Sequence, residues 1–84
     1  MQKAKETAML DTILSLLPGY TSTCRTAQHK SVQHHAYDTP KEYWCCWVND
    51  EKGKKLFAMY DDSKHTVKTV TEDVKNKWVV KQLR

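Results

Sequence analysis

The chain has 84 residues and a formal net charge of +4, with 39% hydrophobic and 29% charged residues, two glycines and two prolines. This balance excludes a wholly disordered chain, and the length predicts one small domain spanning residues 1–84. The positive excess favours anionic partners, although a moderate excess also serves solubility.

The first seventeen residues show no signal for secretion or membrane insertion, because Glu6 and Asp11 interrupt the apolar run that either would need. The cysteines are three, an odd number, and Cys45 and Cys46 are adjacent, so they cannot form a self-contained set of disulfides. We therefore expect a reduced, cytoplasmic protein that does not act at a membrane.

The segment from Lys3 to Leu17 is predicted to be a helix. Its apolar residues recur at helical spacing, and Pro18 and Gly19 end the pattern sharply. The stripe consists of Met9, Leu10, Ile13, Leu14 and Leu17. It is too short to count heptads, so we expect it to pack on the rest of the domain rather than form a coiled coil.

The polar stretch from Thr21 to Pro40 lacks a long period and is expected to be a loop, with "KSVQHHAY" as a candidate short edge strand. Two strand-like runs follow, "EYWCCWVND" and "KKLFAMYDD", joined by "EKG" with Gly53 placed for a tight turn. "HTVKTV" then alternates as a third antiparallel strand would. The three runs predict a meander.

The last segment, "TEDVKNKWVVKQLR", is expected to be a helix, with Thr69 or Thr71 as its cap and Glu72 and Asp73 in the first turn. "WVV" alone would also suit a strand. The predicted fold is an α+β domain: an N-terminal helix, a three-stranded antiparallel sheet and a C-terminal helix.

Alternation along the first strand separates its two tryptophans. Trp44 shares one side with Cys46 and Val48, whereas Trp47 shares the other with Tyr43, whose hydroxyl needs water or a partner. We expect Trp44 to face the core and Trp47 to face a ligand. Both sides are apolar or aromatic, so helices covering both faces, a partner surface and a dimer interface are all open explanations.

A sheet face with stacking aromatic rings and nearby cations is a candidate surface for single-stranded nucleic acid or for a duplex groove. The candidate site residues are Tyr43, Trp47, Tyr60, Lys41, Lys54, Lys55 and Lys68.

The run "YWCCWVND…GKKLFAMYDD…HTVKTVTEDVKNKW" resembles the three-stranded-sheet-plus-helix layout of integrase arm-type and plant ethylene-response-type DNA-binding domains. The resemblance covers about half of the chain, rests on the order of elements, and implies DNA binding. The order of elements also resembles double-stranded RNA-binding domains, but "VTEDVKNK" stands where that family has a lysine-rich run.

No catalytic motif is present, and we expect no enzymatic activity, although Cys24 or Cys45 with a histidine could be imagined as a nucleophilic pair. Zinc is a weaker alternative, because "HH" and "CC" lack the spacing of structural zinc ligands, while His34 and His35 could still bend toward Cys24. We expect no metal or other cofactor. His29 and His65 have the simpler interpretation of solvated residues, and the cysteines that of small core residues.

Two functions remain. The first is a small nucleic-acid-binding protein of unspecified type, using the basic, aromatic sheet face. The second is a small inhibitor or accessory protein of phage or mobile-element type, binding a host protein through the same patch. The net charge favours the first, and the acidic pairs Asp50–Glu51, Asp61–Asp62 and Glu72–Asp73 favour the second. A second copy of the chain is a further candidate partner.

Overall fold

Five antiparallel strands form one sheet in the computed structural model, which describes residues 2–33 and 39–83. The strands pair in the order β4-β3-β2-β1-β5, so β4 and β5 are the two edges. The elements are α1 (Gln2–Ser15), β1 (Gln28–Gln33), β2 (Lys41–Asn49), β3 (Lys55–Asp61), β4 (Thr66–Thr71), α2 (Glu72–Asn76) and β5 (Val79–Gln82).

The α+β class is as expected, but the prediction of a three-stranded sheet is wrong. β1 and β5 add two strands, and β1 lies inside the sheet between β2 and β5 rather than at an edge. The ladder of β1 with β2 runs from Gln28 opposite Cys45 to Val32 opposite Lys41. The ladder of β1 with β5 runs from Lys30 opposite Gln82 to Gln33 opposite Val79. His34 and His35, inside the expected edge strand, and the part of that run that follows them lie outside the described residues.

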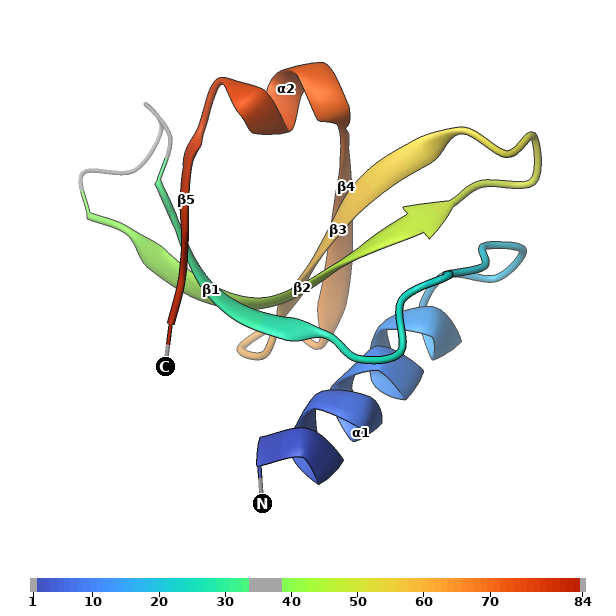
Figure 1. Cartoon of the computed structure of the whole chain (residues 1–84), viewed down its shortest axis with the longest axis horizontal. Coiled ribbons are helices and arrows are strands. Elements are labelled where there is room, and N and C mark those ends of the chain that lie inside the picture. The colour runs from blue at the N-terminus through green and yellow to red at the C-terminus, as the bar shows by residue number, and fades with distance from the viewer. Residues whose placement is uncertain (1, 34–38, 84) are drawn as a thin grey trace.

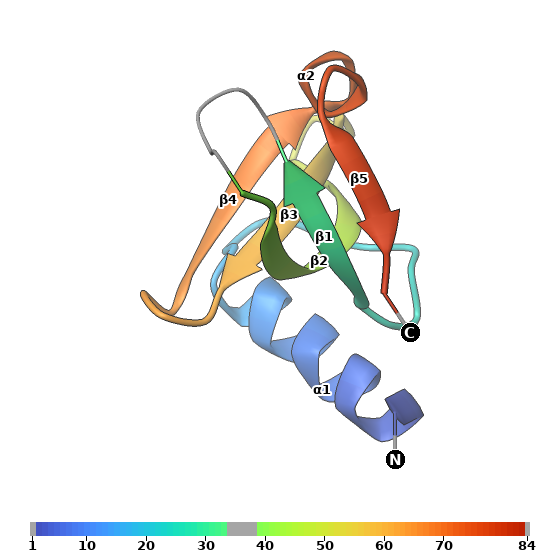
Figure 2. The ribbon, with the colours of Figure 1, turned by 90° about the vertical axis from the view of Figure 1, so that its left-hand side faces the viewer.

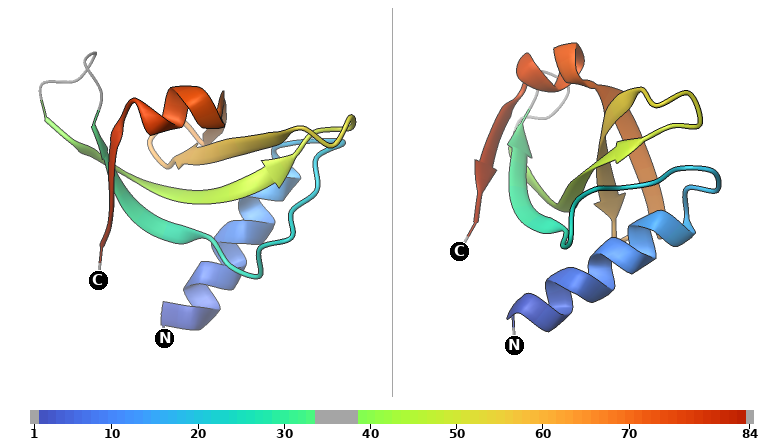
Figure 3. Two further views of the ribbon diagram at one scale, coloured as in Figure 1. Left: turned by 45° about the horizontal axis from the view of Figure 1, so that its top comes forward. Right: turned by 45° about the vertical axis from the view of Figure 1, so that its right-hand side comes forward.

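The sheet is strongly curved, as Figure 1 shows, and the short helix α2 joins its two edge strands at one end. We call the side that α2 overhangs the inner face; its buried residues are Val32, Cys45, Phe57 and Met59. The opposite side, the outer face, is covered by α1 (Figures 2 and 3). Its cluster contains Leu10 and Ile13 of α1 packed with sheet residues such as Cys46, Val48 and Ala58.

The N-terminal helix is confirmed, with Leu10 and Ile13 of the predicted stripe buried. It ends in a succession of tight turns, in which the amides of Leu16, Leu17 and Tyr20 donate to carbonyls three residues earlier. Gly19 has a φ of +86°, a left-handed conformation that glycine adopts without steric cost. In mid-helix the carbonyl of Glu6 accepts the Ala27 amide at 3.0 Å, which ties the loop before β1 to α1.

The expected hairpin is also present, since β2 pairs with β3 from Trp44 opposite Tyr60 to Asn49 opposite Lys55. Its turn holds Gly53 at a φ of +83°. The Asp50 carboxylate accepts the amides of Lys52 and Lys54 at 2.9 and 2.8 Å, so this acidic side chain shapes the turn. β4 completes the predicted meander by pairing with β3.

The C-terminal segment is not one helix, which corrects the second part of the fold prediction. Thr71 is the N-cap, its Oγ1 accepting the Val74 amide at 3.4 Å, and Glu72 and Asp73 occupy the first turn as expected. The helix nevertheless ends at Asn76, and Val79 begins β5. The β-branched Val79 and Val80 suit a strand better than a helix, and β1 offers them a ladder partner.

These findings remove the basis for the resemblance to the DNA-binding domains with a three-stranded sheet and a long helix, since the sheet has five strands and α2 has five residues. Among the described residues, no helix is both long and apolar enough to cross a membrane.

Candidate functional site

Strand β2 distributes its bulky residues between the two faces, because successive side chains point to opposite sides of a strand. Tyr43, Cys45 and Trp47 belong to the inner cluster. Trp44 belongs to the outer cluster, together with Cys46 and Val48. Both tryptophans are half-buried, so neither is wholly enclosed in a core and neither is freely solvated.

The floor of the inner face is apolar and closely packed. Phe57 is 1% exposed, and the ring of Trp47 meets it edge-on at a centroid distance of 5.1 Å. Tyr43, Trp47 and Trp78 remain partly accessible around this buried floor. Partly accessible rings on a concave surface can stack on a flat ligand without the whole core having to open.

Lysine ammonium groups lie over these rings. The Nζ of Lys55 is 4.4 Å from the centroid of the Trp47 ring, and that of Lys68 is 5.7 Å from the Trp78 ring. Lys75 of α2 reaches both Trp47 and Phe57, at 5.7 and 5.6 Å. Such cation–π contacts place positive charge directly beside surfaces that could stack on a base.

A fourth lysine completes the set from the other side. The Nζ of Lys30, on β1, lies 5.9 Å from the Phe57 ring. The four lysines come from β1, β3, β4 and α2, so positive charge surrounds the aromatic floor. We call the four lysines with Tyr43, Trp47, Phe57 and Trp78 the basic aromatic face.

Five of the seven residues singled out from the sequence share this side of the sheet. Tyr43, Trp47, Lys55 and Lys68 belong to the basic aromatic face, and Lys41 pairs with the inner-facing Val32. Lys54 lies in the β2–β3 turn, outside the strands.

Tyr60 lies on the outer face, apart from the other candidates. It is 6% exposed and belongs to the cluster that packs beneath α1. Its hydroxyl lies 2.9 Å from Nδ1 of His65, a residue with a φ of +51° in the β3–β4 turn. Burial raises the pKa of the Tyr60 hydroxyl, and the neighbouring Asp62 raises it further. Tyr60 is therefore placed to anchor a turn.

Four members of the basic aromatic face were not among the sequence candidates: Lys30, Phe57, Lys75 and Trp78. Lys30 begins the candidate edge strand "KSVQHHAY", whose partner the sequence does not identify, and Lys75 falls in the expected long helix, so neither is placed beside Trp47 by the sequence. Trp78 falls in the segment expected to be a helix, whereas it follows α2 and its C-cap Lys77 and packs in the inner cluster. The β-branched pair Val79 and Val80 after "KW" was the sequence signal that the helix ends and a strand begins.

The acidic pairs lie in turns, at the start of α2 and, for Asp61, at the end of β3, so none of them forms the floor of the inner face. Asp50 shapes the β2–β3 turn, and Asp61 accepts the Ser63 hydroxyl and amide in the β3–β4 turn. The Ser63 hydrogen bond and the charge of Lys41 hold the pKa of Asp61 below its usual value, opposed by partial desolvation. Glu72 lies 3.7 Å from Lys55, and this pair is exposed on both sides. The acids thus offset part of the positive charge without covering the rings.

The outer face has an aromatic contact of its own, near the N-terminal half of α1. His29 stacks on Trp44 at 4.9 Å, its Nε2 lies 3.7 Å from Glu42, and Lys5 reaches the Trp44 ring at 5.8 Å. Acidic and basic side chains are mixed here, so this contact favours neither an anionic nor a cationic ligand.

Cys45 and Cys46 lie on opposite sides of β2, Cys24 lies in the loop before β1, and all three are free thiols. Burial raises the pKa of Cys45 to about 12, against the opposing effect of Lys30, and burial likewise raises that of Cys46 to about 12. A neutral thiol is a poor nucleophile and a poor metal ligand. Within residues 2–33 and 39–83, no three His, Cys, Asp or Glu side chains come together as a metal site would require.

In comparisons with known proteins, no family model matches the chain, and no curated protein or solved structure matches it either. Function therefore has to be inferred from the chemistry of the site itself.

Proposed function

We propose that the protein is a small, non-enzymatic nucleic-acid-binding protein that uses its basic aromatic face. The observation that carries the proposal is the placement of the ammonium groups of Lys30, Lys55, Lys68 and Lys75 within 6 Å of aromatic rings on one concave surface. Proteins that bind single strands combine these two features, cations for the phosphates and rings for the bases.

The distribution of charge supports the same proposal. The formal net charge is +4, and the acids lie in turns, at the start of α2 and at the end of β3, so the inner face presents more cations than anions to a ligand. Phosphate contacts supply most of the affinity in such proteins, and they make it salt-dependent. A cytoplasmic location, inferred from the unpaired thiols, is part of this proposal.

A protein partner is the alternative, and the exposed valines of the C-terminal region favour it. Val79 is 56% exposed and Val74 is 38% exposed. Val79 lies on β5, on the side away from Val80 and the inner cluster, and Val74 lies on α2. Exposed apolar side chains are typical of protein-binding surfaces where they gather into a patch. An inhibitor or accessory protein acting on another protein, or on a second copy of this chain, would use them.

A salt titration with labelled oligonucleotides distinguishes the two functions. For three or four phosphate contacts we expect log affinity for a single strand to fall with log salt at a slope of about −2 to −3. The probe is a fluorescein-labelled dodecathymidine, followed by anisotropy, with poly-glutamate of similar length as a competitor. Absence of binding at about 50 mM salt, or equal competition by poly-glutamate, would contradict the proposal.

Lys75→Ala and Lys81→Ala make a matched pair for locating the site. Both remove one positive charge, but Lys75 reaches two rings of the inner face, whereas Lys81 is exposed opposite Ser31, on the other side of β5 from Val80. We expect Lys75→Ala to weaken binding several-fold and to reduce the salt slope by about 0.7, the share of one phosphate. Lys81→Ala is expected to leave both nearly unchanged. Equal effects would place binding elsewhere.

A further inference from the structure

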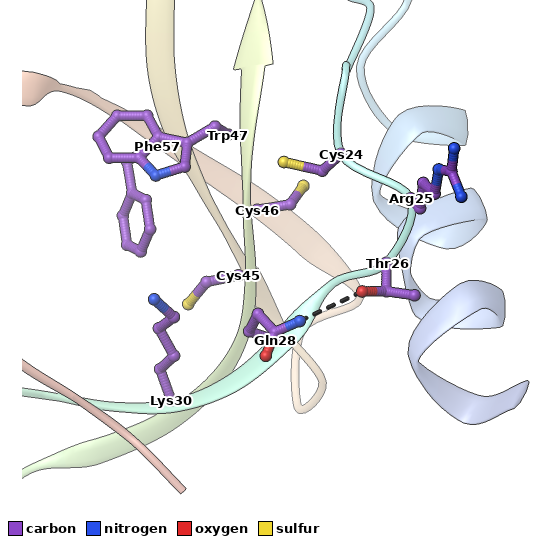
Figure 4. Close-up of a pocket in the computed structure, with 9 residues that line it drawn as sticks. All are labelled: Cys24, Arg25, Thr26, Gln28, Lys30, Cys45, Cys46, Trp47 and Phe57. Carbon is purple, nitrogen blue, oxygen red and sulfur yellow. Dashed lines mark hydrogen bonds between the residues drawn. The ribbon is translucent and has the colours of Figure 1, made fainter. Parts of the chain in front are cut away.

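A cavity opens where the ladder between β1 and β2 stops. The last pair of that ladder is Gln28 with Cys45, and the chain returns to β2 only at Ser22, whose hydroxyl donates to the Trp47 carbonyl at 2.7 Å, and at Thr21, which pairs with Asn49. The residues between, 23–27, leave a gap beside β2, and Figure 4 shows the side chains around it.

The cavity joins the basic aromatic face. Trp47, Phe57 and Lys30 line it from the inner face, so its wall is continuous with the proposed binding surface. Cys24 and Arg25 line it from the loop. A ligand that follows the aromatic floor would therefore meet the cavity beside Trp47.

The size of the cavity suits one ring. Its volume is about 170 Å³, and an apolar cavity of about 150 Å³ admits a benzene-sized molecule. The side chains of Cys45 and Cys46 on its wall are neutral, since burial holds both thiols protonated. A flat, uncharged, six-membered ring matches this space better than a phosphate or a long side chain does.

One polar group on the wall is held in a fixed orientation. The amide nitrogen of Gln28 donates to Thr26 Oγ1 at 3.2 Å, and the Gln28 amide oxygen accepts from the Gln82 side chain. Two hydrogen bonds leave the amide one further N–H and one further lone pair. An oriented amide can meet the polar edge of a base, which an apolar ring lacks.

A base inside a duplex cannot use such a cavity. Its two faces are covered by neighbouring base pairs, and only its edges are exposed in the grooves. The inner face is also closed at one end by α2, which joins β4 to β5 across the curved sheet (Figure 1). A single strand can turn one base out of its stack, whereas a duplex would have to open first.

We propose that this cavity receives one unpaired pyrimidine base against Trp47, with Lys30 at its inner mouth and Arg25 at its outer rim meeting the flanking phosphates. The protein is then specific for single strands and prefers pyrimidines, whose single ring fits the space. This inference rests on the proposed nucleic-acid binding and specifies its ligand.

The test compares single-stranded dodecathymidine and dodecauridine with dodecadeoxyadenosine and with the thymidine–adenosine duplex, all labelled and titrated at one salt concentration. We expect the pyrimidine strands to bind at least about tenfold more tightly than the duplex, the scale of one stacked base. Equal or tighter duplex binding would overturn the single-strand inference while leaving nucleic-acid binding intact. Absence of binding to every probe would overturn both.

Cys24→Leu tests whether the cavity causes the preference for pyrimidine strands, because the larger side chain fills part of the cavity without changing its charge. We expect it to weaken dodecathymidine binding about tenfold and to leave duplex binding unchanged. Thr23→Leu is the matched control, since Thr23 is an exposed neighbour that does not line the cavity. An unchanged pyrimidine preference in a folded Cys24→Leu variant would overturn the inference.

Arg25→Ala provides a second variant if Cys24→Leu does not fold, because Arg25 is exposed and its truncation leaves the core intact. We expect a loss of about threefold for single strands, the scale of one weak surface ion pair, with Arg25→Lys restoring most of it. No loss in Arg25→Ala would contradict the placement of a phosphate at this rim.

Discussion

Cys45 and Cys46 are neighbours in the chain but lie in different environments, because a strand turns successive side chains to opposite faces. Both are buried, and burial makes the thiolate unfavourable for both. Cys24 is half-buried at the cavity wall. The sequence correctly indicated small core cysteines at 45 and 46, since their flanking residues read as a strand.

Thiol labelling tests this difference between the cysteines. At about pH 8 we expect dithionitrobenzoate to react readily with Cys24 only, because the pKa values of Cys45 and Cys46 are about 12 in the folded chain. Guanidinium should expose all three. Because these pKa values are raised above the unfolded 9.0, their contribution to stability is complete below about pH 9 and is lost as the pH rises toward 12. Rapid labelling of three thiols under native conditions would contradict the assigned burial.

Trp44 and Trp47 test the binding role of each sheet face separately, since they lie on opposite faces of one strand. We expect Trp47→Ala to weaken oligonucleotide binding by about 1 to 3 kcal/mol, the scale of a lost stacking contact. Because Trp47 contacts Phe57, the substitution should also lower the free energy of unfolding, by about 1 to 2 kcal/mol for a half-buried ring. Trp44→Ala should cost stability and spare the affinity of the folded protein. Titration of both variants, with guanidinium unfolding alongside, checks this; equal losses of affinity would contradict it.

At the scale of elements, what could be predicted depended on whether the signal was local. The helical spacing of apolar residues before Pro18 and the glycine at position 53 between two aromatic runs are local signals. They correctly predicted α1 and the β2–β3 hairpin. β1 reads "QHKSVQ", with one fully buried apolar residue, Val32. Its strand conformation is imposed by partners far away in the sequence, on β2 and β5. The run "KSVQHHAY" indicated part of this strand, but no local pattern could show that β1 lies inside the sheet.

The same reasoning explains the candidate site. Tyr43, Trp47, Lys55 and Lys68 lie on strands whose alternation the sequence revealed. Lys30 is brought to these rings by the pairing of β1 with β2, and Lys75 by the crossing from β4 through α2 to β5. Only the assembled sheet defines both placements. Tyr60 lies on the outer face because it pairs with Trp44 rather than with Trp47.

The return of the chain through α2 into β5 predicts different roles for neighbouring residues. Trp78 packs in the inner cluster, so Trp78→Ala should lower the free energy of unfolding by about 3 kcal/mol. Val79 faces away from that cluster and is 56% exposed, so Val79→Ala should change it by less than about 0.5 kcal/mol. Guanidinium unfolding of both variants measures the two values. A continuous helix would not separate the two residues in this way, and a harmless Trp78→Ala would contradict the packing of this segment.

At the scale of the whole molecule, the curved sheet separates two tasks. α1 closes the outer face and supplies much of the apolar burial, with Leu10 and Ile13 in its core. The inner face keeps a buried floor but leaves rings and ammonium groups at the surface, where a ligand can reach them. A core on one side and a charged concave surface on the other allow a chain of 84 residues to bury apolar side chains and still present the proposed site.

Chemical-shift mapping with dodecathymidine at low salt tests the central claim most directly, that the inner face is the binding surface. We predict that the indole N–H signals of Trp47 and Trp78 and the amides around Lys30 and Lys75 shift on titration, while the signals of Trp44 and of α1 stay in place. Shifts confined to α1 and the His29–Trp44 contact, or no shifts at all, would contradict the account.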